Sequence, residues 1–427
     1  MTNLNITHEQ KSFKEEFIKP LFEISKMVKA RKCPQLTYYD HLLLGIERIL
    51  SESISGRAFV QQSVEQNRIH NLEVRTLFKA ISSKHRLKYL QEINKKLFEN
   101  NVELLDDSLE DIPELKKFAL YAGDGHYHAH ATHEEKIDDK YRSTGNLYFI
   151  DMRSHLMKHL DVVKSTAKNK RKHDIKTLKE KQNLLRFNTP KGKKVLITYD
   201  RASIDFHFWW CLKKSKGVYF LTREKSNMKL KDNIIGLNNW EKSDPRNIGI
   251  KSDELCGCHA HVSVRRIVYI DPEDGKEIVF ITNEMTIPPG VLAYLYKLRW
   301  NIEKKFDSFK NTFLEKKSWC KNITGKYQQA LFLCIAHNLI TIFEHRLKVE
   351  ENIIDKKCFK EKEKRIEEYK NNMIEKKLTP NPLFLKLRKL SKFSLQFIRT
   401  IRNKLFISAS WQDFLVAIRP SMEQYFW

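Results

Sequence analysis

Four polar side chains recur at helical spacing in the stretch YKLRWNIEKKFDSFK, residues 296–310. A helix turns about 100° per residue, so these side chains would lie within an arc of about 60° on one face of the helix. They are Tyr296, Arg299, Glu303 and Lys310. A carboxylate can hold a metal ion, while a hydroxyl and two cations can bind phosphate oxygens. The alternative is a solvated stripe with a Glu–Lys partnership.

The spacing Tyr-x2-Arg-x3-Glu-x6-Lys resembles the signature of one branch of the bacterial insertion-sequence transposases, and this sequence matches it without a departure. The resemblance covers roughly residues 118–345. It implies a cut-and-paste DDE transposase with an RNase H-like core. It also implies that Glu303 is the third catalytic carboxylate and that the other three signature residues contact DNA at the ends of the element.

A DDE site requires two further aspartates, each at the end of a core strand. Asp124 follows the stretch FALYAG, and Asp200 follows VLITY. Arg201 fits the Asp-Arg pair that is usual at the second acid of this family. Two alternatives stay open: Asp124, within Gly-Asp-Gly, could be an ordinary turn residue, and Asp200 could be the N-cap of the next helix, with Asp205 as its rival.

Three converging carboxylates would repel one another unless a cation neutralised them. Mg²⁺ prefers hard oxygen ligands, and hydrolysis of a phosphodiester commonly uses two metal ions about 3.5–4 Å apart. We therefore expect Asp124, Asp200 and Glu303 to hold two Mg²⁺ ions, for which Mn²⁺ could substitute.

Aromatic and basic residues supply further candidates for DNA contact. The resemblance implies that Trp300 stacks on a base flipped from a cleaved end, which would support a hairpin intermediate. Packing of Trp300 in the core is the alternative. Trp240 is a second stacking candidate. The basic candidates are residues 164–172, residues 191–194, and Lys213, Lys214 and Lys216.

Composition agrees with a partner that is a polyanion. The chain has 427 residues, a formal net charge of +25, and 41% hydrophobic residues, which argues against extensive disorder. A charge of this size favours nucleic acid over a membrane surface. The longest nearly apolar stretch, residues 330–343, is shorter than the roughly 20 residues needed to cross a bilayer. Seven scattered cysteines and a polar start lead us to expect a cytoplasmic protein. The resemblance to insertion-sequence transposases implies that it is bacterial and associated with the nucleoid.

Periodicity predicts an α/β protein in which helices flank a central sheet. Residues 8–100 are expected to be helical, and strands are expected at 118–123, 147–153, 194–200 and 218–224. The first of these strands should run into a turn. The motif DPEDG predicts a hairpin within 261–282. Further helices are expected over 164–185, 204–212, 291–311, 327–378 and 383–418, with a break at the sequence TPNP.

Five regions follow from this pattern. We predict a helical N-terminal region that binds DNA ends, the first part of an RNase H-like core, a β-rich insertion before the last catalytic acid, the last part of the core with Glu303, and a helical C-terminal region suited to dimerisation. Their predicted bounds are 1–115, 116–217, 218–287, 288–345 and 346–427.

Two clusters of soft ligands have a weaker claim to a metal. Four histidines, His126, His128, His130 and His133, follow Asp124, and the first three alternate as residues on one face of a strand do. A polar face lining the active cleft is favoured over a metal site. The motif CGCHAH, from Cys256 to His261, has Cys-x-Cys spacing, whereas structural zinc sites prefer two to four residues between cysteines.

The sequence therefore predicts a transposase that binds terminal inverted repeats as a homodimer and performs metal-dependent strand cleavage and transfer on double-stranded DNA. Three alternatives remain: an inactive relative that only binds DNA, a structure-selective nuclease on the same core, and a basic RNA-binding protein.

Overall fold

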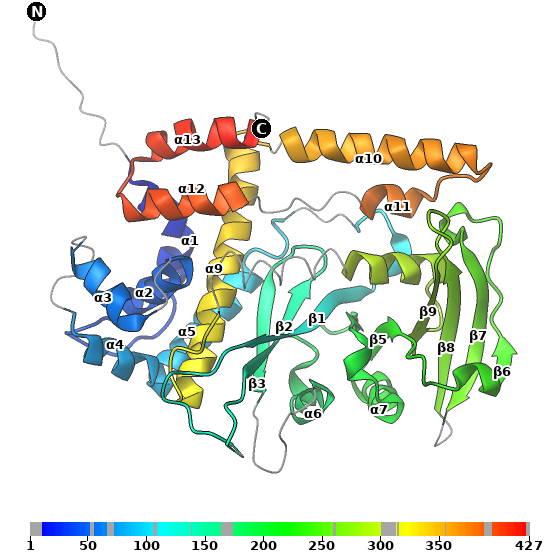
Figure 1. The fold of residues 1–427 in the computed structure, drawn as a ribbon, viewed down its shortest axis with the longest axis horizontal. Helices are drawn as coiled ribbons and strands as arrows, with labels where there is room; N and C mark the ends of the chain where they lie inside the picture. The colour runs from blue at the N-terminus through cyan, green and yellow to red at the C-terminus, as the bar shows by residue number, and fades with distance from the viewer. Residues whose placement is uncertain are drawn as a thin grey trace, which may run out of the picture.

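A single mixed sheet forms the centre of the molecule. The computed structural model describes residues 11–51, 55–65, 72–105, 109–137, 139–163, 174–258, 262–299, 313, 316–354, 356–387 and 395–423. Within these residues the sheet has nine strands in the order β3-β2-β1-β4-β5-β9-β8-β7-β6 (Figure 1). Its hydrophobic core is continuous with that of the helices around it.

The first half of the sheet combines antiparallel and parallel strands. β1 pairs antiparallel with β2 and β2 with β3, whereas β4 lies parallel to both β1 and β5. β4 and β5 are short, nearly continuous buried runs, as expected of parallel strands covered on both faces. The bounds are β1 Phe118–His128, β2 Thr144–Asp151, β3 Met157–Val163, β4 Lys194–Thr198 and β5 Val218–Arg223.

The second half is antiparallel throughout. It joins the first half where β9 pairs with β5, with Leu221 opposite Thr282. The predicted hairpin is confirmed: β8 and β9 pair, and Gly275, at φ +71°, donates its N–H to the carbonyl of Asp271 at 2.8 Å. The bounds are β6 Ile234–Leu237, β7 Ile250–Cys258, β8 Val262–Ile270 and β9 Glu277–Thr282.

Helices from both ends of the chain gather on one side of the sheet. The helical prediction for most of residues 8–100 is confirmed where the structure describes it. The five N-terminal helices are α1 Phe13–Lys26, α2 Tyr38–Leu50, α3 Gly56–Glu65, α4 Val74–Ile81 and α5 Lys84–Glu99. The C-terminal helices are α10 Lys356–Glu375, α11 Pro382–Leu387, α12 Leu395–Phe406 and α13 Trp411–Glu423. Phe13 stacks on Phe414 at 4.3 Å, so α1 and α13 pack together (Figure 1).

The long helix α9 (Ile323–Glu350) stands beside the edge strand β3 (Figure 1). The side chain of Asn338 accepts from the N–H of Met157 at 2.6 Å and donates to its carbonyl at 2.9 Å. This contact covers backbone groups that an edge strand would otherwise expose. α9 is long and apolar enough to span a bilayer by length and composition, but 83% of that window is buried inside the protein, as in the core helix of a globular fold.

The remaining helices lie between strands. α6 is Asp174–Glu180, α7 is Phe206–Lys216, and residues 289–299 form a further helix up to the end of that described stretch. Short 3₁₀ helices are η1 Pro113–Leu115, η2 Gln182–Leu184, η3 Arg201–Ser203, η4 Leu230–Asn233 and η5 Pro245–Asn247. α7 agrees with the helix predicted to begin at residue 204.

Sequence patterning missed three strands: β3, β6 and β7. In addition, β5 pairs with β4, although the predicted insertion begins at residue 218. The predicted domain boundaries remain predictions.

Candidate active site

Asp124 and Asp200 lie in one row across two parallel strands. Ala122 pairs with Thr198 in the ladder between β1 and β4, and each aspartate lies two residues beyond that pair. Residues two apart on a strand share a face, and neighbouring strands are about 4.8 Å apart. The register therefore brings these two half-buried carboxylates to the same face at the end of the parallel ladder.

The expectation that the first strand turns at Asp124 is wrong. β1 continues to His128, and Asp124 pairs with Tyr148 of β2. The strand persists because β2 keeps its register with β1 well past the last pair with β4. Asp124 thus lies within β1 and beside β2, but beyond the last residue of β1 that pairs with β4.

The glycines on either side of Asp124 permit close packing on the opposite face of the sheet. A Cβ on Gly123 would lie 2.4 Å from a ring carbon of Tyr199, and one on Gly125 would lie 2.8 Å from a carboxylate oxygen of Asp174. Tyr127 donates its hydroxyl to Asp174 at 2.6 Å. The Gly-Asp-Gly sequence is therefore a packing requirement of a strand and not a turn.

Asp200 is held beside β5. The N–H of Tyr199 donates to the carbonyl of Leu221 at 3.0 Å, and the hydroxyl of Thr222 donates to the carbonyl of Asp200 at 2.9 Å. These bonds extend the parallel register past Thr198.

The side chain that caps α7 belongs to Asp205, which accepts from the N–H of Phe208 at 2.9 Å. Asp205, and not Asp200, is therefore the N-cap of α7. Arg201, directly after Asp200, is exposed at the start of η3.

Two of the four signature residues lie in the described part of the helix that begins at residue 289. Tyr296 and Arg299 are 2% and 3% exposed, and a guanidinium nitrogen of Arg299 lies 3.4 Å from the Tyr296 hydroxyl. The Tyr296 ring packs on Phe280 of β9 at 5.2 Å. Tyr296 and Arg299 therefore contact each other, whereas the shared face predicted for all four signature residues remains a prediction. Trp300, Glu303 and Lys310 lie outside the described residues.

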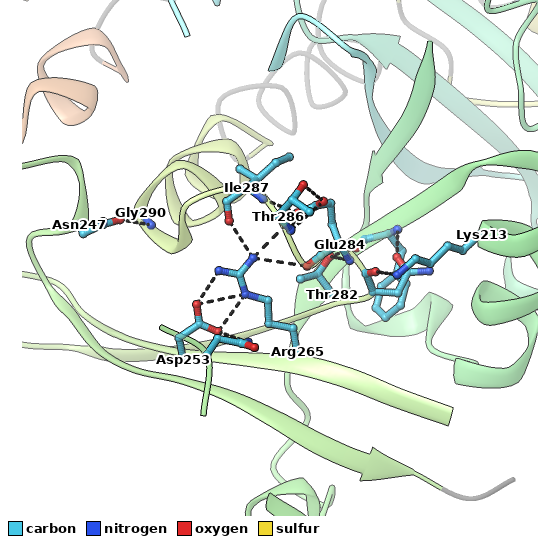
Figure 2. Close-up of polar contacts among 12 residues, drawn as sticks. Lys213, Asn247, Asp253, Arg265, Thr282, Glu284, Thr286, Ile287 and Gly290 are labelled. Atoms are coloured by element: carbon cyan, nitrogen blue, oxygen red, sulfur yellow. Dashed lines mark hydrogen bonds and ion pairs between the residues drawn. The ribbon is translucent and has the colours of Figure 1, made fainter. Parts of the chain in front are cut away.

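A buried polar hub fixes the start of this helix (Figure 2). The carboxylate of Glu284 accepts from the N–H groups of Thr286 and Ile287 at 2.8 and 2.7 Å. Arg265 of β8 donates to the carbonyl of Ile287 at 2.7 Å and forms an ion pair with Asp253 of β7 at 2.5 Å. The second half of the sheet therefore anchors the helix that carries the signature. Sequence reasoning missed this hub; its signal was an arginine pair within an otherwise apolar strand.

Gly290 provides a second anchor at the same point. Its N–H donates to the side chain of Asn247 at 2.9 Å. A Cβ at Gly290 would lie 1.9 Å from the carbonyl oxygen of Arg246, so only glycine fits at this approach. Together with the hub, this contact fixes the direction in which the helix leaves the sheet.

The chain is anchored again beyond residue 312. The N–H of Ala129 donates to the carbonyl of Lys316 at 3.0 Å, and the N–H of Ser318 donates to the carbonyl of Ala129 at 2.9 Å. The Ser318 hydroxyl also lies 3.0 Å from His128. The segment that contains Glu303 is thus tied to β8 before it and to the end of β1 after it.

The histidine cluster is divided among different surroundings. His126 and His128 are buried on the face of β1 that carries Asp124, His130 stacks on Tyr141 at 4.1 Å, and His133 is exposed. Within the described residues no group of three or more His, Cys, Asp or Glu side chains is arranged to hold a metal ion. Glu303 lies outside the described residues.

The cysteine cluster lies at the end of β7. Burial raises the pKa of both Cys256 and Cys258 to about 11, so binding of zinc there would have to release the protons of both thiols. His259 and His261 lie outside the described residues.

The other residues predicted to contact DNA differ in their exposure and in their partners within the protein. Trp240 is half-buried against the core. Lys213 donates to the carbonyl of Asn283 at 2.6 Å, and Lys216 bonds to the side chain of Asn183, so both have partners within the protein. The basic residues 191–193 are exposed, and residues 164–172 lie outside the described residues.

Comparison with known families gives further evidence on the class of protein. Residues 147–339, from β2 into α9, match the family model described as a transposase DDE domain. The match supports a DDE transposase family. Such a domain indicates a polynucleotidyl transferase and implies a DNA substrate. Asp200 and Glu303 fall within the matched residues, whereas Asp124 precedes them. No curated protein matches the chain.

Proposed function

We propose that this protein is a transposase that binds the terminal inverted repeats of its own element and moves it by metal-dependent strand cleavage and strand transfer. The observation that carries the proposal is the row formed by Asp124 and Asp200 at the end of the parallel ladder. The described residues before and after the segment with Glu303 are held at Ile287 by Arg265 of β8, and at Lys316 and Ser318 by Ala129, directly after β1. The match to a transposase DDE domain supports it independently.

The strand order supports an RNase H-like core. Three antiparallel strands, β1 to β3, are followed by β4 and β5, which lie parallel to β1 in the order β3-β2-β1-β4-β5. In this proposal β6 to β9 are an insertion placed before the last catalytic acid, and they extend the core sheet instead of forming a separate layer.

The donor set fits magnesium. Asp124 and Asp200 are half-buried carboxylates on one face, and such hard oxygen donors suit an ion that retains several waters. Asp124, Asp200 and Glu303 would hold two Mg²⁺ ions, with Mn²⁺ able to substitute. Bound there, the ions would supply activation of the attacking oxygen and charge stabilisation on the leaving oxygen.

The proposed reaction begins with hydrolysis. A water oxygen attacks the phosphorus at the element's end, the bond to the 3′ oxygen breaks, and a free 3′ hydroxyl and a 5′ phosphate result. The 3′ hydroxyl then attacks a phosphorus of the opposite strand, and the bond from that phosphorus to the 3′ oxygen of the flanking DNA breaks, which releases the flank and leaves a hairpin end. A second water attacks the hairpin phosphorus, which frees the 3′ hydroxyl again and leaves a 5′ phosphate. The 3′ hydroxyl finally attacks a phosphorus of target DNA and displaces a 3′ oxygen of the target strand as a hydroxyl.

This chain's side chains position the DNA in that scheme. Tyr296, Arg299 and Lys310 bind phosphates near the cut, with the Tyr296–Arg299 contact orienting both groups. Arg201 binds a further phosphate, and Trp300 stacks on the flipped base. Since Tyr296 and Arg299 are buried, they would receive a phosphate only at the inner end of the site.

Charge and the need to hold two ends together complete the proposal. A net charge of +25 suits binding of both terminal repeats and target DNA. We propose that two subunits pair the ends, with the helical C-terminal region contributing to the dimer, in the cytoplasm of a bacterium close to its nucleoid.

A plasmid that carries the gene with its native flanking DNA tests this function. Purified protein is added with Mg²⁺, with EDTA, or as the Glu303→Gln variant, and cut ends are mapped by sequencing. Paired cuts at inverted repeats, lost in both controls while end binding persists, are expected. Binding without cleavage by the folded wild type would identify an inactive relative. Cuts that ignore the repeats would identify a nuclease.

A further inference from the structure

The row of Asp124 and Asp200 continues onto a third strand. Thr198 pairs with Leu221 in the parallel ladder between β4 and β5. Two residues further along, Asp200 is therefore level with Arg223, the last residue of β5. The backbone bond from Tyr199 to Leu221 continues the ladder past Thr198, and the hydroxyl of Thr222 bonds to the carbonyl of Asp200, so the two chains stay side by side there. Asp124, Asp200 and Arg223 thus occupy equivalent positions on three adjacent parallel strands.

The neighbour of Arg223 on β9 shows which face it occupies. Arg223 pairs directly with Phe280, and directly opposed residues in an antiparallel ladder share a face. Phe280 packs on Tyr296 of the signature helix. Arg223 therefore lies on the face covered by that helix, together with the two aspartates.

The backbone that presents Arg223 is held on both sides. The N–H of Glu224 donates to the carbonyl of Val279 at 2.9 Å, and the carboxylate of Glu224 accepts from Arg266 at 2.9 Å. On the other side, Thr222 bonds to Asp200. Arg223, a half-buried residue, therefore extends from a fixed backbone position at the end of β5.

We propose that Arg223 is a phosphate-binding residue of this site and that it holds a non-bridging oxygen of the DNA phosphate that is cut. The inference rests on the proposed function, because it places the reacting phosphate above the aspartate row. A guanidinium binds phosphate oxygens through paired N–H donors and keeps its charge at any physiological pH. It would draw the phosphate toward the carboxylates, which otherwise repel it.

A charge-deletion cycle between protein and DNA tests the contact without requiring cleavage. Element-end duplexes carry one methylphosphonate, which removes a phosphate charge, either at the cut junction or one helical turn inside the repeat. Wild type and Arg223→Gln are compared for binding in Ca²⁺. The junction substitution should weaken wild-type binding about 10- to 100-fold, as for one charged hydrogen bond. It should weaken Arg223→Gln no further, whereas the internal substitution should affect both proteins equally.

Lys251→Gln is the matched control, since it removes one positive charge from an exposed site on β7, where Lys251 pairs with Glu277 at 3.6 Å. It should leave the junction effect intact. Additive effects of Arg223→Gln and the junction substitution would overturn the proposal, even if the wild type cleaves its ends. Coupled effects without any cleavage would support Arg223 as a phosphate ligand while refuting the proposed transposition chemistry. Arg223→Lys should restore binding in part, because it returns the charge without the paired donors.

Discussion

In the second half of the sheet, Arg265 and Asp253 form an ion pair in which both side chains are almost fully buried, at 4% and 0% exposed. In the first half, Asp124 and Asp200 are half-buried at the end of a ladder. Both sets are charged groups on strands of one sheet. The second-half charges neutralise each other inside the protein, whereas the first-half carboxylates are half-buried at the end of the parallel ladder, where we propose that they bind metal ions.

A second ion network extends this comparison to the junction of the halves. Arg266 of β8 binds Glu254 of β7 at 2.6 Å and Glu224, just after β5, at 2.9 Å. Buried pairs of this kind contribute little net stability compared with apolar packing, but removal of one partner is costly. Their use here is to fix geometry, since the same strands hold the start of the signature helix and the end of β5.

The largest expected effect is on catalysis. Asp200→Asn should lower cleavage about 10³-fold or more, because a lost ligand removes several kcal/mol of transition-state stabilisation. The free energy of unfolding should change little, since Asp200 is half-buried and Asp205 provides the helix cap. Cleavage assays and denaturant unfolding measure the two effects. If both fell together, Asp200 would be a structural residue like Asp253.

The next effect is on stability. Arg265→Met should lower the free energy of unfolding by about 3–5 kcal/mol, because it leaves the Asp253 carboxylate buried without its cation. The double variant Arg265→Met/Asp253→Leu should recover most of that loss. Urea unfolding of the wild type, both single variants and the double variant gives the coupling energy. An equal loss in single and double variants would show that Arg265 acts through its contact with Ile287 alone.

A smaller effect should follow from a single added methyl group in the first half. Gly123→Ala places a Cβ 2.4 Å from Tyr199, which is packed against Trp209, so overpacking should cost about 1–3 kcal/mol. Gly236→Ala in β6 is the control, because its nearest atom is 4.0 Å away. Thermal unfolding should separate the two variants. Equal stability would mean that β1 can move away from Tyr199.

The smallest effect concerns the cysteine cluster. Cys258 is only partly buried beside the core, and the Cys-x-Cys spacing is unusual for structural zinc. Cys258→Ala should therefore change the free energy of unfolding by less than about 1 kcal/mol, and chelators should have no further effect. Unfolding curves with and without EDTA, together with the zinc content of purified protein, provide the check. Bound zinc in equal molar amount would contradict this expectation.

Elements with local signals were predicted from the sequence. The hairpin after β8 has its turn residues in DPEDG, and β4 and β5 are apolar runs. The strands that were missed depend on partners remote in sequence. β7 contains Asp253 and Glu254, which look incompatible with a buried strand until β8 supplies their cations. Arg266 lies opposite Glu254, and Arg265, diagonal to Asp253 across the ladder, forms an ion pair with it.

The candidate site was predictable to a similar degree. The two aspartates follow apolar runs, so their positions could be chosen from the sequence, but their adjacency depends on the pairing of β1 with β4. Continuation of β1 past Asp124 could not be anticipated, because the flanking glycines are explained only by the approach of Tyr199 and Asp174. Arg223 has no motif of its own, and only the register singles it out.

The central claim is that Asp124 and Asp200 hold a divalent ion next to DNA. Fe²⁺ can take the place of Mg²⁺ at oxygen-rich sites, and with ascorbate and peroxide it cuts the nearest backbone. In the complex with an element end, cuts are predicted beside residues 124, 200 and 303. They should be suppressed by excess Mg²⁺ and absent in the Asp124→Asn and Asp200→Asn variants. Cuts that cluster elsewhere, such as at His126–His133, or that persist in both variants, would contradict the account.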